Sequence, residues 1–168
     1  MVSMAPNSQR YDYTYTYTDL CNKKKIEETD TDTIYDILKR NPRFSKTLKM
    51  IDMALLKNFL KSKGDGYTIF VTEDSNIPDE WMRDLDVFKA QNFINSYIVI
   101  GEADRDYLVK NGSSIYIPRK YHYNNPILVL VHDNEIIVNN VGKITYELQA
   151  NNGFIHVLDN IAEVSYVN

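Results

Sequence analysis

Cysteine is nearly absent from this chain of 168 residues, which contains only Cys21. A disulfide bond within the chain is therefore impossible, and the fold must be held together by its apolar core. A single thiol is compatible with a reducing cytosol but does not exclude secretion. Cys21 could pair with another chain, but an inert thiol is the simpler interpretation.

Long apolar runs are also missing. No stretch approaches the roughly 20 consecutive apolar residues that a membrane-spanning helix needs. The first ten residues lack the continuous apolar segment of a secretory signal. Three explanations stay open: export by another route, a signal already removed from this sequence, or a protein that works inside the cell.

Positive charge is not in excess. The chain has 19 Lys and Arg against 23 Asp and Glu, which gives a formal net charge of −4 and a pI near 5.4. The tight basic run Lys23–Lys25 is best explained as a solvated face. Because phosphate contacts need clustered cations, this balance argues against a dedicated nucleic-acid-binding protein.

Motifs for catalysis and metal binding are missing as well. The sequence has no Gly-x-Ser-x-Gly elbow, no phosphate-binding glycine loop and no dinucleotide fingerprint. No two of the histidines (His122, His132 and His156) have the i, i+4 spacing of a helical metal site, and no cysteine cluster accompanies them. His156 lies in an apolar run, which favours a satisfied core histidine. We therefore predict a protein without catalytic activity, cofactor or metal.

Residues 1–30 differ from the rest of the chain and are predicted to form an N-terminal extension. Tyrosine alternates with Thr or Asp over Tyr11–Thr18, so four tyrosines would line one face of a strand. This segment could be an edge strand or a partly ordered tail. Alternatively, its aromatic strip could add to a partner's sheet or contact sugar rings. Residues 31–168 then form a single domain.

Helix signals come first in this domain. Thr33 and Asp36 have the spacing of a capping box, and Pro42 ends this helix and can open the next. Apolar residues at helical spacing predict two core-facing helical stripes. These residues are Phe44, Leu48, Ile51 and Leu55 in the first stripe, and Val87, Phe88, Phe93 and Ile94 in the second.

Short apolar runs bounded by turn residues then predict strands. The runs are 67–71, 97–100, 114–117, 127–131, 135–138, 143–146, 154–158 and 163–167. Helices followed by closely spaced strands indicate an α+β domain with mainly antiparallel sheets rather than alternating βαβ units.

Three segments carry a resemblance to the fasciclin (FAS1) domain family, over about residues 31–164. The first resembles the family's opening helices, the second its first signature motif with Asp74, and the third its terminal motif. They are Thr33–Leu48, Gly66–Ser75, and Val138-Asn139 with Asn152-Gly153, Ile155-His156-Val157 and Asp159. The resemblance implies a mainly antiparallel β-sandwich or wedge flanked by several α-helices.

The resemblance also implies adhesion or binding to the extracellular matrix, outside the cell or at its surface. Integrin-binding members often carry a Tyr-His pair that matches Tyr97 and Ile98, and an Asp-Ile pair that matches Glu147 and Leu148. Tyr97, Glu147 and Leu148 are accordingly the predicted receptor contacts, with an integrin-type receptor or a matrix protein as partner. Ile98 and Glu147 depart from the family's residues at those positions.

Two alternative functions remain at this stage. The 13 tyrosines favour a domain that binds carbohydrate or another small ligand, and the missing signal favours an intracellular protein-interaction domain. Asn111-Gly112-Ser113 is a formal N-glycosylation acceptor, which would be used only on a secretory route. Whether Asn111 carries a glycan therefore helps to distinguish a secreted protein from an intracellular one.

Overall fold

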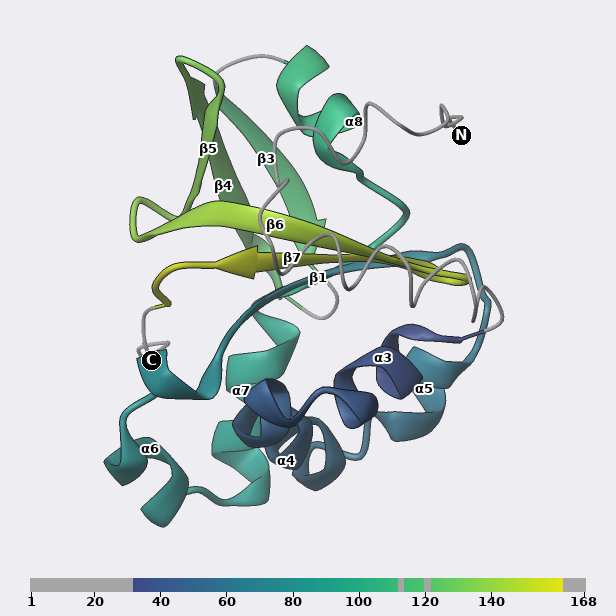
Figure 1. The fold of residues 1–168 in the computed structure, drawn as a ribbon, viewed down its shortest axis with the longest axis vertical. Coiled ribbons are helices and arrows are strands. Elements are labelled where there is room, and N and C mark those ends of the chain that lie inside the picture. Colours follow the sequence, from purple (N-terminus) through teal and green to yellow (C-terminus); the bar gives the residue numbers. More distant parts are fainter. Residues whose placement is uncertain (1–31, 112–113, 120–121, 162–168) are drawn as a thin grey trace.

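The structure is a computed structural model that describes residues 32–111, 114–119 and 122–161. The predictions for the Tyr-Thr segment, for Cys21 and for a strand over 163–167 lie outside the described residues. Within them, a layer of helices packs below a curled sheet, and one helix lies on the opposite side of the sheet (Figure 1). None of the described helices is both long and apolar enough to cross a bilayer.

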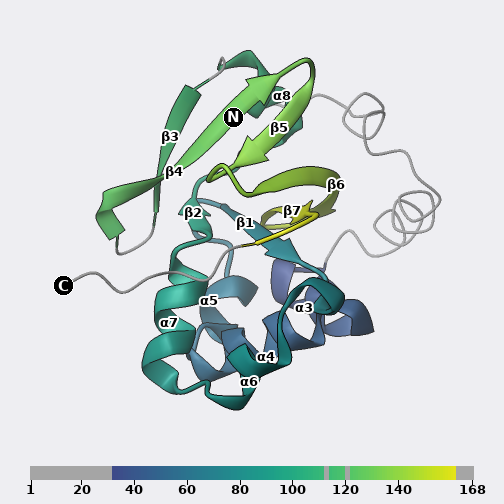
Figure 2. The same cartoon turned by 90° about the vertical axis from the view of Figure 1, so that its left-hand side faces the viewer.

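The helical layer comes mostly from the first half of the domain, as the sequence predicts. The described helices, of which η1 and η2 are short 3-10 turns, are α3 (Ile34–Arg40), η1 (Pro42–Phe44), α4 (Ser45–Met53), α5 (Lys57–Lys61), η2 (Asp74–Asn76), α6 (Asp79–Arg83), α7 (Val87–Asn95) and α8 (Arg105–Lys110). Figure 2 shows α3 to α7 together below the sheet, with α8 near the β3–β5 end.

The described strands form one sheet that closes on itself in the order β1 to β7. They are β1 (Tyr67–Thr72), β2 (Ile98–Ile100), β3 (Ser114–Arg119), β4 (His122–His132), β5 (Glu135–Val138), β6 (Gly142–Ala150) and β7 (Gly153–Leu158). All neighbouring strands are antiparallel except β1 and β7, which are parallel. The α+β fold with mainly antiparallel strands is confirmed. The expected sandwich is instead a single curled sheet, because β1 and β7 pair directly.

The first helix begins as its sequence predicts. The Thr33 hydroxyl accepts from the Asp36 backbone N–H, and the Asp36 carboxylate accepts from the Thr33 N–H, which completes the capping box. The helix ends at Arg40 before Pro42, whose ring removes a backbone donor. These local signals fix where the chain enters and leaves α3.

The helical layer is tied to the sheet by a polar chain. The Arg43 Nε donates to the Tyr146 hydroxyl at 2.9 Å, and that hydroxyl donates to the Glu73 carboxylate at 2.6 Å. The Arg43 guanidinium also lies 4.9 Å from the centre of the Phe44 ring. Phe44 is itself fully buried in the apolar core that fills the space between helices and sheet.

Candidate functional site

The residues predicted to contact a receptor are buried. Glu147 and Leu148 are each 1 % exposed and Tyr97 is 4 % exposed. Glu147 and Leu148 lie on β6, which pairs on both edges with other strands, and Tyr97 lies between α7 and β2. The expectation that they offer an exposed contact is wrong, because neither the pattern of β6 nor the Asp-Ile match reveals what packs over the strand.

Glu147 is used inside the fold. Its Oε1 accepts a hydrogen bond from the Arg105 backbone N–H at 3.0 Å, at the start of α8. The same oxygen lies 3.9 Å from Nδ1 of His156, which is the residue directly opposite it on β7. The carboxylate therefore joins α8 to the β6–β7 hairpin, in a place that no receptor reaches.

His156 is the core histidine that its apolar surroundings predict. The ring is fully buried and stacks on Phe70 with centroids 5.3 Å apart. Because a carbonyl oxygen can only accept, the Nε2 of His156 donates to the Ala103 carbonyl at 2.7 Å. Burial lowers the pKa of His156 to about 4, although the bond to Ala103 and the charge of Asp104 act in the opposite direction. The imidazole is thus neutral at pH 7.

The Glu147–His156 pair has the residue types of an acid–base site but not its access. Both side chains are sealed from solvent, so a substrate cannot reach them. Among the described residues, no group of three or more His, Cys, Asp or Glu side chains could hold a metal ion. The two side chains face each other at 3.9 Å, but with the His156 proton on Nε2 no hydrogen bond joins Nδ1 to the Glu147 carboxylate.

Asn152 connects the two ends of the described chain. Its Oδ1 accepts from the Ile34 N–H at 2.9 Å, and its Nδ2 donates to the carbonyls of Leu60 and Ser62. Ile34 opens α3, so Asn152 supplies an acceptor that the helix itself lacks. The terminal motif therefore holds the beginning of the helical layer.

The next residue, Gly153, permits a close approach between β7 and β1. A Cβ atom at this position would lie 1.8 Å from the Tyr67 carbonyl oxygen, and the backbone has φ of +155°. No side chain fits there. The Asn-Gly pair that resembles a simple turn in the sequence is thus required by the parallel pairing of the two strands.

The two aspartates of the family motifs also bind backbone groups. Asp74 Oδ1 accepts from the Lys46 N–H at 2.8 Å, and its Oδ2 accepts from the Ser45 hydroxyl, so this carboxylate caps α4. Asp159 Oδ1 accepts from the Lys143 N–H at 2.8 Å. Both oxygens of Asp74 thus serve α4, which precedes this residue in the chain.

Asn111 is exposed at the end of α8. Its Nδ2 donates to the Tyr107 carbonyl at 2.6 Å. The rest of the acceptor sequence, 112–113, lies outside the described residues. Glycosylation of Asn111 stays a prediction.

Three large apolar side chains that the sequence places in the core are exposed. Leu55 is 78 % exposed, Phe88 65 % and Val87 47 %. The first stripe fails at Leu55 because α4 ends at Met53, and Leu55 has a left-handed φ of +61°. Phe88 lies about 140° around α7 from the buried Phe93, so one face cannot bury both.

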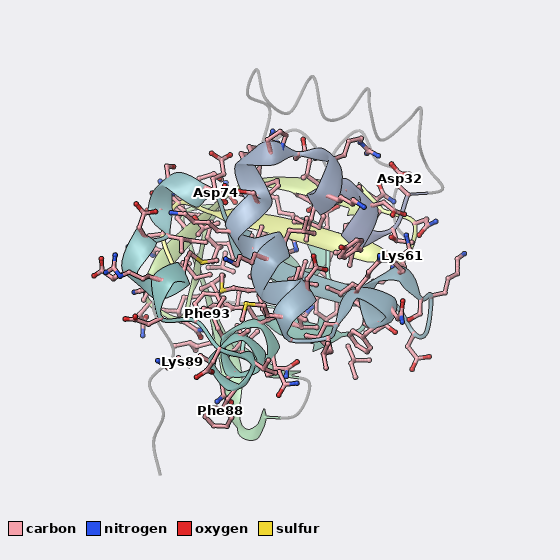
Figure 3. The ribbon with its side chains drawn as sticks, turned by 90° about the horizontal axis from the view of Figure 1, so that it is seen from below. Asp32, Lys61, Asp74, Phe88, Lys89 and Phe93 are labelled. Atoms are coloured by element: carbon pink, nitrogen blue, oxygen red, sulfur yellow. The ribbon has the colours of Figure 1, made fainter. Side chains whose placement is uncertain are left out.

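These side chains lie on neighbouring elements. Gln91, one turn after Val87 and Phe88 on α7, donates from Nε2 to the carbonyl of Ala54, which precedes Leu55. Figure 3 shows Phe88 at the margin of the helical layer, away from Phe93. We call Leu55, Val87 and Phe88 the apolar α4–α7 surface. The angle of about 140° between positions 88 and 93 of a helix is the feature of the sequence that could have predicted the exposure of Phe88.

Acidic residues border this surface. Asp84 and Asp86 are exposed directly before α7, and the Asp86 carboxylate caps the helix by accepting from the Lys89 N–H. An apolar centre with a charged border is the usual composition of a protein interface. This surface, rather than the Glu147 region, is the candidate contact site.

The comparisons with known proteins agree with the fold. The fasciclin domain model matches residues 42–163. A solved structure described as a FAS1 domain pair from the insect cell adhesion molecule fasciclin I matches with a TM-score of 0.65 and 19 % identity, over 77 % of this chain and 50 % of that chain. The chain thus spans about half the length of that protein, and at this identity the likeness concerns the fold alone. A search of curated proteins found no match. Since the family match extends over most of the sequence, the chain belongs to the fasciclin domain family.

Proposed function

We propose that this chain is a non-catalytic interaction module that serves adhesion and binds a cell-surface receptor or a matrix protein through the apolar α4–α7 surface. The observation that carries the proposal is the exposure of Leu55, Val87 and Phe88 on adjoining elements. Membership of the fasciclin family supports the general role, because its domains mostly mediate adhesion or interaction. The sealed Glu147–His156 pair supports a role without catalysis.

Leu55 contributes the strongest part of this argument. Leucine in the left-handed region costs about 1–2 kcal/mol, and an exposed leucine gains nothing from burial in the free protein. Asn or Gly would suit this loop better. A residue that strains the backbone of the free protein and gains nothing from burial is expected where a partner covers it.

The charge around the surface restricts the partner. Asp84 and Asp86 lie beside Val87 and Phe88, so a complementary partner presents basic side chains around an apolar pocket. Phe88 is the expected anchor, because aromatic side chains dominate binding energy at the centre of interfaces. We assign the partner to the cell surface or matrix, where fasciclin domains usually occur.

The test measures attachment of cells from the natural source to the immobilised full-length protein, together with saturable binding of the soluble protein to those cells. We expect Phe88→Ser and Leu55→Asn each to weaken binding about tenfold. Tyr107→Ser is the matched control, because Tyr107 is 45 % exposed on α8 at the opposite side of the sheet. Equal loss in all three variants, or binding that never saturates, contradicts the proposed surface.

A second measurement concerns location. The untagged protein is expressed in its natural source and sought in the medium, on the cell surface and inside the cell. Recovery outside with glycan on Asn111 is the expected result. Retention inside without glycan contradicts adhesion and leaves only an intracellular interaction role.

A further inference from the structure

The segment between β2 and α8 runs over the sheet on the side that faces away from the helical layer. Figure 1 shows α8 as the only described helix on this side. We call residues 101–111, which comprise this connection and α8, the α8 segment. Side chains from three adjacent strands hold it in place by binding its backbone.

Two of these three strands hold the α8 segment through a titratable side chain. On β1, Thr68 Oγ1 accepts from the Ala103 N–H at 2.8 Å. On β7, His156 Nε2 donates to the Ala103 carbonyl at 2.7 Å, and on β6 the Glu147 carboxylate accepts from the Arg105 N–H at 3.0 Å. Because β7 lies between β1 and β6, the imidazole is at the centre of this attachment.

A charged His156 ring has no suitable place for its second proton while the segment is closed. Since the first proton is on Nε2, the second must go on Nδ1, which is buried and has no hydrogen-bond partner among the described residues. The Glu147 oxygen opposite Nδ1 is 3.9 Å away, beyond hydrogen-bonding distance. The other acidic group near the ring is Asp104, whose carboxylate caps α8. Burial outweighs these opposing charges and lowers the pKa of His156 to about 4.

The rest of the α8 segment is weakly anchored. Its buried apolar side chains are Ala103 and Leu108, and Val109 is partly buried against the core. The Arg105 guanidinium donates to the Asn134 carbonyl at 3.0 Å, so this cation is engaged at the turn between β4 and β5. A short helix with so few apolar contacts is expected to open at a lower free-energy cost than the core of the domain.

We propose that the α8 segment is an acid-sensitive lid, which opens locally when His156 takes up its second proton and thereby exposes the sheet beneath it. Opening gives Nδ1 access to water, so the ring recovers its ordinary pKa of about 6.5. The open state therefore takes up the proton first as the pH falls, and the equilibrium shifts toward it between pH 6.5 and pH 4. This window includes the pH of about 5–6 at which histidine-based switches act.

The lid is independent of the apolar α4–α7 surface, which lies on the opposite side of the sheet. Phe88→Ser, which removes the proposed anchor of that surface, should leave the opening of the α8 segment unchanged. The two proposals can therefore fail separately.

The experiment measures hydrogen–deuterium exchange of the full chain by mass spectrometry at pH 7, 6 and 5, corrected for the intrinsic effect of pH on exchange. We expect the protection of amides in peptides that cover 103–111 to fall about 20-fold from pH 7 to pH 5, as pKa values of about 6.5 and 4 require. These amides should be at least about tenfold less protected than those of α4 at each pH. Equal protection of the two segments would mean that α8 leaves the sheet only when the whole domain unfolds, which overturns the proposal.

Three variants assign the pH dependence to one group. His156→Gln can still donate to the Ala103 carbonyl but does not titrate, so its protection should change less than about twofold between pH 7 and pH 5. Glu147→Gln and Asp104→Asn keep acceptors for the backbone N–H groups of the α8 segment. Both should retain a fall of about 20-fold or more, because losing a carboxylate disfavours the charged ring further in the closed state.

Three results of these comparisons would overturn the proposal. The first is a wild-type fall in His156→Gln, and the second is loss of the fall in either of the other variants. The third is stronger protection of the α8 segment in acid, because Glu147 would then have moved to pair with the charged ring in the closed state. Since each result is a ratio between two pH values, a variant of lower overall stability still gives a valid test.

Discussion

The β6–β7 hairpin and the apolar α4–α7 surface, at the rim of the helical layer, differ in which side chains they bury and which they expose. The hairpin buries polar groups. Glu147, Asn152 and His156 are each at most 1 % exposed, although side chains of these types are usually found on the surface. The rim exposes apolar groups, with Leu55 and Phe88 largely in solvent. One region buries polar side chains that bind backbone groups inside the fold, and the other leaves apolar area exposed.

The difference separates the residues that define the family from those that we propose to contact a partner. Asn152, Gly153 and His156 belong to the motif by which the sequence resembles fasciclin domains, and each has a partner or a steric reason inside the fold. Leu55 and Phe88, which are largely exposed, lie outside that motif. A family motif can therefore reveal the fold while saying little about the surface that acts.

The largest expected loss of stability follows from a substitution in the β6–β7 hairpin. Gly153→Ala places a Cβ 1.8 Å from the Tyr67 carbonyl oxygen, so β1 and β7 must separate. We expect the free energy of unfolding to fall by at least about 4 kcal/mol, or the protein not to fold. Urea unfolding followed by tryptophan fluorescence measures it.

Gly101→Ala is the control for this substitution. Gly101 has a left-handed φ of +113°, but nothing lies within 4 Å of its Cβ position. It should lose only about 1–2 kcal/mol, from backbone strain alone. Similar losses at positions 101 and 153 would show that the approach to Tyr67 is not what requires glycine.

Asn152→Ala comes next. It removes an acceptor from the Ile34 N–H and the donors to Leu60 and Ser62, and leaves these buried backbone groups unpaired. We expect a loss of about 3 to 4 kcal/mol in unfolding free energy. Asn58→Ala, at an exposed position of α5, should stay within about 0.5 kcal/mol of the wild type. A loss below about 1 kcal/mol at position 152 would contradict its role as a connector.

Acid should weaken the hairpin through His156. Its pKa falls from about 6.5 in the unfolded chain to about 4 in the folded protein, because burial disfavours the charged ring. The unfolded state therefore takes up the proton first as the pH falls. The contribution of the neutral His156 ring to the free energy of unfolding is fully present above pH 6.5. It is lost progressively toward pH 4, by about 3 kcal/mol at most. Urea midpoints between pH 7 and pH 4 measure the slope.

His156→Gln isolates that slope, because glutamine can still donate to the Ala103 carbonyl but does not titrate. The variant should be less stable at pH 7 and should depend less on pH between 6.5 and 4. His132→Gln, at an exposed position, should keep the wild-type slope. Parallel pH profiles for the wild type and His156→Gln would assign the acid sensitivity to other groups.

The same contrast explains how far the sequence could predict the structure. Strand positions and the α3 capping box follow from local signals, such as the short apolar run of β5 and the Thr33–Asp36 spacing, and both are confirmed. The burial of Glu147 could not be predicted in this way, since its backbone donor at Arg105 is 42 residues away. The closed sheet likewise depends on the parallel β1–β7 pairing between distant segments.

The sequence does not predict the apolar α4–α7 surface, for a different reason. Helical periodicity predicts which residues share a stripe but not where the helix stops, so Leu55 was assigned to a stripe that ends two residues earlier. Phe88 is predicted to share a core-facing stripe with Phe93, although the angle of about 140° between them argues against a common face. Both misassigned residues belong to the surface that we propose for partner binding, as expected where a sequence departs from the needs of folding.

The smallest expected effect has the opposite sign and bears most directly on this surface. Leu55→Asn replaces an exposed leucine at φ of +61° with a residue that tolerates the left-handed region. We expect the free energy of unfolding to rise by about 1 kcal/mol while cell binding falls. Asn140→Leu is the reverse control, since Asn140 is exposed at φ of +60° and should lose a similar amount of stability. Leu55→Asn that gains stability and keeps full binding would mean that the leucine serves no partner, and the apolar α4–α7 surface would then have to act through Phe88 and Val87 alone.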